Sequence, residues 1–126
     1  MKVIFFTTLL LFSINGFAFN WKKVSEDTKG NSFYVDIDNI KKHNGLVYYW
    51  ELADYLEPLK GIANSDISKY KANCEEGKTI RINSTYYSQS MGRGKIITET
   101  TPNKTNYPKP TTIEYIQMKF ACNNAR

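Results

Sequence analysis

Two strands joined by a tight turn are the most constraining feature of the sequence. Residues 68–88, SKYKANCEEGKTIRINSTYYS, alternate between apolar and polar side chains on both sides of a Glu-Glu-Gly-Lys turn. Because successive side chains of a β-strand point to opposite faces, the alternation predicts an antiparallel hairpin with one face in the core and one in water. The core face is assigned Tyr70, Ala72, Cys74, Ile80 and Ile82. The solvent face is assigned Lys69, Lys71, Asn73, Arg81 and Asn83.

The start of the chain predicts export. Lys2 precedes a mostly apolar run at residues 3–12, which is too short to span a bilayer and is typical of a signal peptide. Small residues flank the phenylalanine of the GFA segment at 16–18, as a signal peptidase requires. We therefore expect a signal peptide at residues 1–18 and one mature domain of 108 residues (126 − 18) at residues 19–126.

The mature chain carries no sequence feature of a membrane anchor. The expected cleavage site has no cysteine for lipid attachment, and no later run is long and apolar enough to cross a bilayer. We expect a protein that is exported, either periplasmic or secreted, and free of a membrane anchor.

The two cysteines predict one disulfide. In an exported chain with two cysteines, Cys74 and Cys122 can pair only with each other inside a monomer. The alternatives are two free thiols or half of a metal site. Neither is favoured, because the sequence has no CxxC motif and a single histidine. We expect no metal and no cofactor.

The charge of the chain suggests a contact surface rather than a nucleic-acid site. The net charge is +5, or +4 once Lys2 is removed, and the basic residues alternate with acidic ones instead of forming a dense stripe. Export makes nucleic acid a still poorer partner. We expect a possible binding face for a protein or an acidic glycan, formed by Lys69, Lys71, Arg81, Arg93 and Lys95.

The remaining segments complete an α+β architecture. Strands are expected at 19–24, 32–36, 46–55 and 95–100, in addition to the two strands of the hairpin. A helical turn is expected at 38–43, a loop at 57–65 and an irregular segment at 101–110, which holds three prolines. The prediction is a small six-stranded antiparallel sheet with a C-terminal helix packed on it and tied to the hairpin by the disulfide.

Two side-chain assignments follow from the same patterns. Thr111 and Glu114 match a capping box, and apolar residues at helical spacing continue the helix to about Cys122. In the 46–55 strand the apolar parity contains Trp50, which is therefore expected in the core.

No set of residues predicts catalysis. Asp36 and Asp38 could present a metal-binding DxD, but a cap of a helical turn explains Asp38, and no calcium-loop glycine and glutamate follow. His43 has no partner nucleophile, so we expect a solvated loop residue and no enzyme. Several aromatic residues could instead form a stacking surface for sugar or peptide, namely Tyr48, Tyr49, Trp50, Tyr55, Tyr86 and Tyr87.

A series of short motifs resembles the surface-adhesin protein E family of small exported bacterial proteins. The motifs, in order, are Trp21, Tyr34-Val35-Asp36, Trp50-x-Leu52-x-Asp54-Tyr55, the Cys74 hairpin with Arg81, Tyr86-Tyr87-Ser88, Met91-Gly92-Arg93-Gly94 and Ala121-Cys122. The resemblance implies a small antiparallel sheet with a C-terminal helix and a disulfide. It also implies a non-enzymatic role, since the family takes its name from an adhesin of host matrix proteins. That adhesin is lipid-anchored, whereas this chain lacks the lipid-bearing cysteine.

A second resemblance gives the alternative function. The spacing from Tyr70 through Cys74 to Gly77, followed by an alternating strand, is similar to the opening of lysozyme-inhibitor domains of the membrane-bound C type. Those domains carry a late Ser-Gly segment that residues 91–94 match poorly. The alternative is therefore a periplasmic inhibitor of a lysozyme-type enzyme.

Overall fold

A long, strongly twisted antiparallel sheet and one C-terminal helix make up the described part of the chain. The structure is a computed structural model that describes residues 18–126, so the predicted signal peptide lies outside the described residues except for its last position. The strands are β1 (Trp21–Glu26), β2 (Ser32–Asp36), β3 (Lys41–His43), β4 (Leu46–Leu59), β5 (Ala63–Asn73), β6 (Lys78–Gln89), β7 (Arg93–Thr100) and β8 (Lys104–Asn106). The helices are the short 3₁₀ helix η1 (Ser90–Gly92) and the α-helix α1 (Ile113–Asn124).

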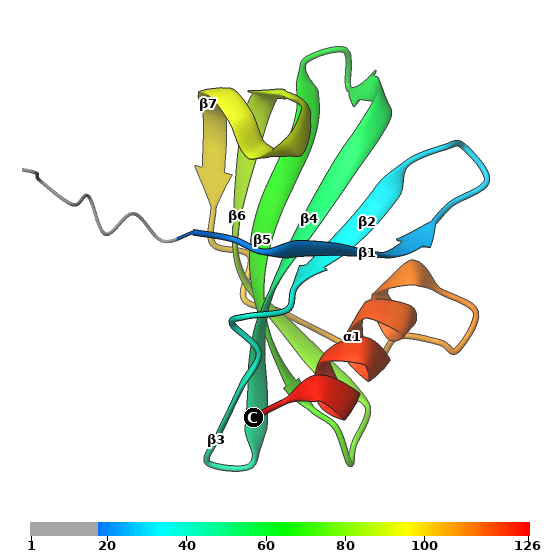
Figure 1. Ribbon diagram of the computed structural model, residues 1–126, viewed down its shortest axis with the longest axis vertical. Helices are drawn as coiled ribbons and strands as arrows, with labels where there is room; N and C mark the ends of the chain where they lie inside the picture. Colours follow the sequence, from blue (N-terminus) through cyan, green and yellow to red (C-terminus); the bar gives the residue numbers. More distant parts are fainter. Residues whose placement is uncertain (1–17) are drawn as a thin grey trace, which may run out of the picture.

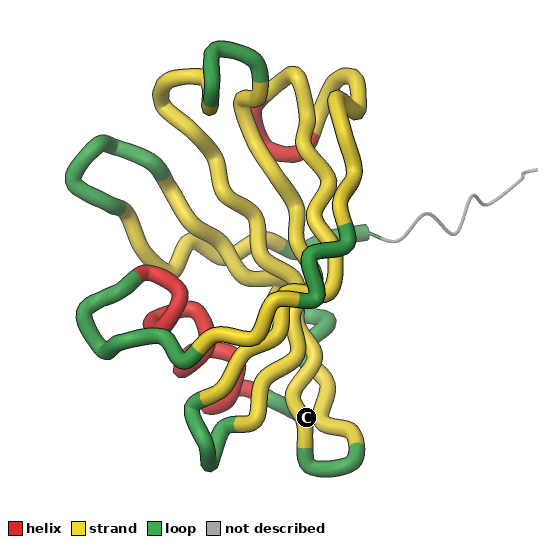
Figure 2. Tube along the Cα trace, turned by 180° about the vertical axis from the view of Figure 1, so that it is seen from behind, coloured by secondary structure: helices red, strands yellow, loops and turns green. Residues whose placement is uncertain are grey.

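The strands follow the order β1-β2-β4-β5-β6-β7, with β3 paired to β4 and β8 paired to β6. The long strands β4, β5 and β6 form the centre, and α1 lies across the end of the sheet near β3 (Figure 1). Seen from behind, the strands lie in front of the helix (Figure 2). All pairings in the described residues are antiparallel, which confirms the predicted α+β class.

The expectation of six strands is wrong, because the described residues form eight. Residues 41–43 were expected in a helical turn and instead form β3. Asn44 and Gly45 both have positive φ, at 50° and 78°, so the chain reverses within two residues and returns antiparallel along β4. The proline-rich segment also contributes a strand, because the three residues of β8 lie between Pro102 and Pro108 and pair with β6.

The predicted loop at 57–65 is mostly strand. β4 continues to Leu59 and β5 begins at Ala63, so only a tight turn separates them. Lys60 and Gly61 supply that turn with φ values of 51° and 71°. The proline at position 58 is tolerated near the end of the strand, where few ladder hydrogen bonds remain to be lost.

The main core lies between α1 and one face of the sheet. Met118 and Ala121 of the helix are 2% and 0% exposed and belong to one buried cluster with Val47, Tyr49 and other residues of the sheet. The helix begins one residue later than expected. Thr112, not Thr111, is the N-cap and accepts a hydrogen bond from the Tyr115 amide at 3.3 Å.

The expected burial of Trp50 in the core is wrong. Tyr49, its neighbour in β4, is 0% exposed and faces α1, whereas Trp50 is only partly buried on the opposite face. Both parities of this strand are aromatic, so the pattern did not identify the face that the helix covers. We call the sheet face opposite α1, which carries Trp50, the outer face.

A β-bulge changes the faces of β6. The register slips between Lys69 and Tyr70 of β5, so that Lys69 lies opposite Asn83 but Tyr70 lies opposite Arg81. The extra residue, Ile82, shifts the alternation by one position. Arg81 therefore lies on the helix side of the sheet, and its assignment to the same face as Lys69 is wrong.

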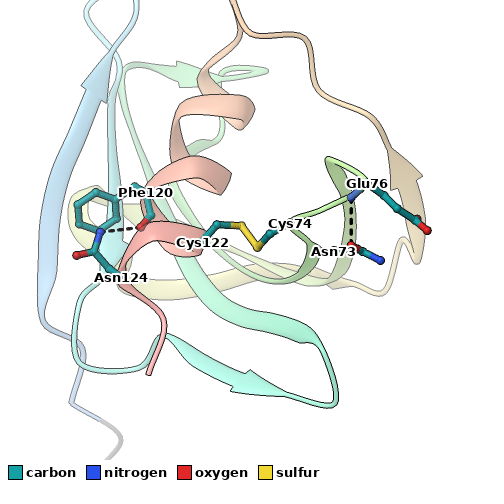
Figure 3. The surroundings of a disulfide bond; sticks show 6 residues. All are labelled: Asn73, Cys74, Glu76, Phe120, Cys122 and Asn124. Atoms are coloured by element: carbon teal, nitrogen blue, oxygen red, sulfur yellow. Dashed lines mark hydrogen bonds between the residues drawn. A yellow bond between two sulfur atoms is a disulfide. The ribbon is translucent and has the colours of Figure 1, made fainter.

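The disulfide prediction is confirmed. Cys74 and Cys122 are bonded across 48 positions of sequence, with their Cα atoms 6.0 Å apart. Figure 3 shows that the bond joins the last turn of α1 to the end of the β5–β6 hairpin. The backbone of Arg126 adds two hydrogen bonds, to Ile40 and Lys42, so the end of the chain is held beside β3 as well. None of the helices in the described part of the chain is long and apolar enough to cross a membrane.

Candidate functional site

Lysine and aromatic side chains alternate on the outer face of the sheet. Trp50 lies opposite Lys69, and Tyr48 lies opposite both Lys71 and Lys41 across the two neighbouring strands. Directly opposed residues share a face, so these five side chains form one surface. We call it the lysine strip, defined by Lys41, Tyr48, Trp50, Lys69 and Lys71.

Contacts inside the strip bring the cations over the rings. The Lys69 ammonium lies 5.4 Å from the ring centroid of Trp50 and 6.0 Å from that of Tyr48. Such cation–π contacts at exposed sites are worth about 0.5–1 kcal/mol, enough to favour one rotamer of a flexible lysine. The strip therefore presents at least one positioned positive charge beside an aromatic surface.

The N-terminal residues of the described chain extend the aromatic surface. The ring of Phe19 stacks on Trp21 with centroids 4.5 Å apart and meets Trp50 edge to face at 5.6 Å. Both arrangements are favoured by the ring quadrupoles. Because Phe19 is the first residue after the expected cleavage site, export would place the new N-terminus at this cluster.

A groove of about 620 Å³ begins at this aromatic cluster and follows the outer face toward β7. Its lining residues come from the N-terminal segment and from strands β4 to β7, and they are Phe19, Trp50, Ile67, Asn83, Ser84, Thr85, Tyr87, Glu99, Thr100 and Thr101. A volume of this size falls in the range of roughly 300–1,000 Å³ that small-molecule sites occupy. We call it the outer groove.

The five basic residues predicted to form a binding face do not lie together. Lys69 and Lys71 lie side by side on the outer face. Arg93 and Lys95 are exposed in β7, and Arg93 pairs with the last residue of β6, at the end away from the Cys74 hairpin turn. Arg81 lies on the other side of the sheet.

Arg81 belongs to a polar cluster beneath the start of α1. Its guanidinium nitrogen lies 3.6 Å from an Asp66 carboxylate oxygen, and it donates to the Ser68 hydroxyl at 2.9 Å. The Tyr55 hydroxyl donates a short hydrogen bond to the other oxygen of Asp66. Burial raises the pKa of the Asp66 carboxyl, while the hydrogen bond from Tyr55, the positive charge of Arg81 and the hydrogen bond from Ser68 act in the opposite direction.

A second buried carboxyl belongs to the same cluster. Glu51 is 8% exposed, and the amide nitrogen of Gln117, when turned toward it, donates to both of its oxygens at 3.2 Å. Burial raises the pKa of Glu51 well above the usual carboxyl value, and the negative charges of Glu114 and Asp66 raise it further. These groups line a pocket of about 200 Å³ between α1 and the sheet.

Glu114 is tied to the sheet rather than to the helix cap. Its two carboxylate oxygens accept hydrogen bonds from Thr79 at 2.7 Å and Asn106 at 2.6 Å. The predicted capping box is therefore wrong in both residues, because Thr112 rather than Thr111 is the N-cap and Glu114 bonds to the sheet. A charged residue with two partners on β6 and β8 holds the first turn of α1 in place, which is a structural use of this side chain.

The other candidate residues have structural surroundings. Asp36 is 0% exposed and accepts hydrogen bonds from the amides of Asn20 and Asp38 and from the Asn39 side chain. His43 is exposed in β3 beside Asn44. Within residues 18–126, no group of three or more histidine, cysteine or carboxylate side chains could hold a metal ion. The geometry offers surfaces for contact and grooves for binding.

Sequence reasoning missed three parts of these sites. Lys41 was not included in the basic face because its segment was expected to be helical, although the Asn44-Gly45 turn could have predicted a strand pair there. Glu51 was not singled out, although an acidic residue directly after a run of apolar and aromatic residues in a strand indicates a buried carboxyl group. Glu99 is brought to the outer groove by the pairing of β7 with β6, for which no local pattern exists.

Comparisons with known proteins place this geometry in a family. The family model described as Surface-adhesin protein E matches residues 21–123. Crystal form II of Haemophilus influenzae protein E is similar at 18% identity, with 82% of this chain and 87% of that chain covered and a TM-score of 0.63. Another structure of Haemophilus influenzae protein E is similar at 19% identity, with 82% and 84% covered and a TM-score of 0.58. No curated protein matches the chain at a significant level.

Proposed function

The chain belongs to the surface-adhesin protein E family, and on that premise we propose that it is an exported binding domain that acts by contact rather than by catalysis. The observation that carries this proposal is the lysine strip, where three lysines and two aromatic rings share the outer face. Trp and Tyr are among the side chains that contribute most at protein interfaces, and lysines beside them can steer an acidic partner toward the surface. The family name, surface adhesin, supports a partner outside the cell membrane.

We infer that the partner is an acidic protein or an acidic glycan, such as a host matrix glycoprotein. Lys41, Lys69 and Lys71 supply positive charge on neighbouring strands, while Arg93 and Lys95 lie farther along the sheet and add only to the general field. Charges separated by more than about 8 Å are largely screened at physiological salt. The strip lysines should therefore set both the rate of association and its dependence on salt.

Binding kinetics of two triple variants test this function. The strip variant replaces Lys41, Lys69 and Lys71 by Gln and keeps both aromatic rings. The control variant replaces three exposed lysines outside the strip by Gln, and these are Lys29, Lys60 and Lys109. Both variants lose the same charge, so a difference between them reports position rather than net charge.

The assay is surface plasmon resonance against immobilised matrix glycoproteins at low and at physiological salt. We expect the strip variant to associate about tenfold more slowly at low salt and to lose most of the salt dependence. The control variant should keep most of its association rate and most of its salt dependence. Equal association rates for both variants at both salt concentrations would contradict the strip as the contact surface.

Two further measurements separate this function from its rivals. Cell fractionation shows whether the exported protein reaches a surface where it could meet a host partner, since a strictly periplasmic protein cannot act as an adhesin. A turbidity assay of lysozyme activity tests the alternative of an enzyme inhibitor. Inhibition of lysozyme at equimolar protein, together with no binding to matrix glycoproteins, would replace our proposal by that alternative.

A further inference from the structure

We propose that the outer groove is a binding site for an uncharged oligosaccharide. The proposal rests on the proposed function in one respect, because both assign a binding role to the outer face. The groove and the lysine strip share only Trp50, so the two proposals can fail separately.

The register of the sheet builds the floor of the groove. Ile67 lies opposite Thr85, and Thr85 lies opposite Glu99, so the three side chains form one row across β5, β6 and β7. In the next row Tyr87 lies opposite Ile96, and on the other side Asn83 lies opposite Lys69. Because these positions are fixed by backbone pairing, the groove is preformed.

Aromatic rings line the groove from two strands that are separated by β5. Trp50 of β4, with Phe19 against it, and Tyr87 of β6 are both among its lining residues. Aromatic rings combine a large apolar surface with a polar edge, which suits the flat, hydrogen-rich faces of a pyranose ring. Two separated aromatic rings can each contact one sugar unit, so they suit an oligosaccharide better than a monosaccharide.

Polar side chains with unused hydrogen-bonding capacity lie between the rings. Within residues 18–126, the side chains of Asn83, Thr85 and Glu99 make no hydrogen bond or ion pair with another residue. An amide, a hydroxyl and a carboxylate together offer donors and acceptors in the mixture that sugar hydroxyls require. Ser65, by contrast, is already bonded to Gln89 and Gly92.

The side chains that line the groove favour a neutral ligand at its Glu99 side, whereas Lys69 and the N-terminus expected at Phe19 place positive charge beside Trp50. No lysine or arginine is among the lining residues, and the single charged one is Glu99. Burial raises the pKa of Tyr87, and the negative charge of Glu99 raises it further. A sulfated or carboxylated glycan would meet negative charge here, whereas a neutral one would meet only dipoles.

The 3₁₀ helix η1 packs on a residue of the groove floor. A Cβ atom added to Gly92 would lie 2.6 Å from the Ile67 side chain, so the backbone of η1 packs directly on it. Gly92 has a φ of 69°, which L side chains rarely adopt. Leu52 and Ile67 beneath η1 are 0% and 5% exposed, so both side chains are closely packed there.

A titration of the mature protein with defined oligosaccharides tests the proposal. The probes are the neutral hexasaccharides maltohexaose, cellohexaose and chitohexaose, and a heparin-derived hexasaccharide serves as the anionic comparison. Amide chemical shifts in ¹⁵N-labelled protein report where each probe binds. We expect at least one neutral probe to give saturable shifts in β6 and β7 around Thr85 and Glu99, with a dissociation constant in about the millimolar range or tighter.

Substitutions on the two sides of one strand pair give the matched control. Asn83→Ala with Thr85→Ala removes two hydrogen-bonding groups from the groove, and binding should weaken about tenfold. Thr98→Ala changes an exposed residue that lines a different surface pocket and should leave binding unchanged. The wild-type shift map localises binding even if the double variant does not fold.

Three outcomes overturn the proposal. These are the absence of saturable shifts with every neutral probe at about 10 mM, shifts confined to residues outside the groove, and binding of the heparin fragment alone. Gln substitution of Lys41 and Lys71, the two strip lysines that lie opposite Tyr48, should leave neutral-sugar binding intact. Loss of protein-partner binding in that variant together with retained sugar binding would show that the two sites act independently.

Discussion

The disulfide is the part of the fold whose energy can be worked out most directly. Replacing Cys74 and Cys122 by serine opens a loop that spans 48 positions of sequence. In the chain-entropy model, closing a loop of that length lowers the entropy of the unfolded chain enough to stabilise the fold by about 4 kcal/mol. We expect the Cys74→Ser, Cys122→Ser variant to lose about this much free energy of unfolding.

The variant should still fold, because the helix is held by more than the disulfide. Met118 and Ala121 stay buried against the sheet, and the Arg126 backbone pairs beside β3. A domain of this size has a total stability of about 5–15 kcal/mol, so a loss of 4 kcal/mol leaves it marginal. The melting temperature should fall by about 15–30 °C.

Urea unfolding followed by tryptophan fluorescence measures this loss, with the oxidised parent as reference. The parent in reducing agent is the matched control, since it opens the same loop without a substitution. Both forms should unfold at the same urea concentration. A loss below about 1 kcal/mol in both would refute the loop-closure reasoning and show that the unfolded chain is already compact in this region.

Three further predictions concern stability and are measured by thermal or urea unfolding. Tyr49→Ala should cost about 3–5 kcal/mol and Trp50→Ala clearly less, and equal costs would contradict the assignment of the core face. Thr112→Ala should cost about 1 kcal/mol, whereas Thr111→Ala should be nearly neutral because only Thr112 caps the helix. The raised pKa of Glu51 means that the folded state keeps a proton that the unfolded state releases, so stability is greatest below the usual carboxyl pKa and falls as pH rises through the folded-state pKa. Glu51→Gln should remove this fall, and an unchanged pH profile between about pH 4 and pH 8 would show that Glu51 is ionised in the fold.

The sequence predicted those features that depend on local periodicity and on simple counting. The central hairpin, the 32–36 strand and the C-terminal helix each have a clear period, and the structure confirms all three. The disulfide followed from the presence of two cysteines in a chain with a predicted signal peptide, and it is confirmed as well. These features need no knowledge of what packs against them.

The errors occur where a neighbour in space decides the structure. Residues 41–43 have no strong strand pattern and become β3 only because β4 lies beside them after the turn. Residues 104–106 become β8 because β6 offers free edge groups. Short strands of this kind are stabilised by pairing rather than by their own propensity, which is why a pattern search does not find them.

The face on which Arg81 lies is a further feature that local sequence patterns could not predict. A strict alternation places Lys69, Lys71 and Arg81 on one face. A single bulged residue instead puts the Arg81 side chain on the opposite face, beside Asp66. The residues next to position 82 include no glycine or proline from which the bulge could have been predicted. The consequence for function is large, because the bulge turns one predicted surface into a lysine strip and a separate buried cluster.

The aromatic run in β4 explains why the outer face was the hardest part to predict. Tyr48, Tyr49 and Trp50 are consecutive, so both faces of the strand carry large rings, and hydrophobic content cannot say which face is core. The helix decides the matter, because the disulfide fixes its last turn beside the hairpin and its Met118 and Ala121 then meet the Tyr49 side. Trp50 is left on the side that the helix does not cover, where it joins the lysine strip to the outer groove. The packing of α1 thus determines that Tyr49 is the core ring of this strand and that Trp50 lies on the outer face.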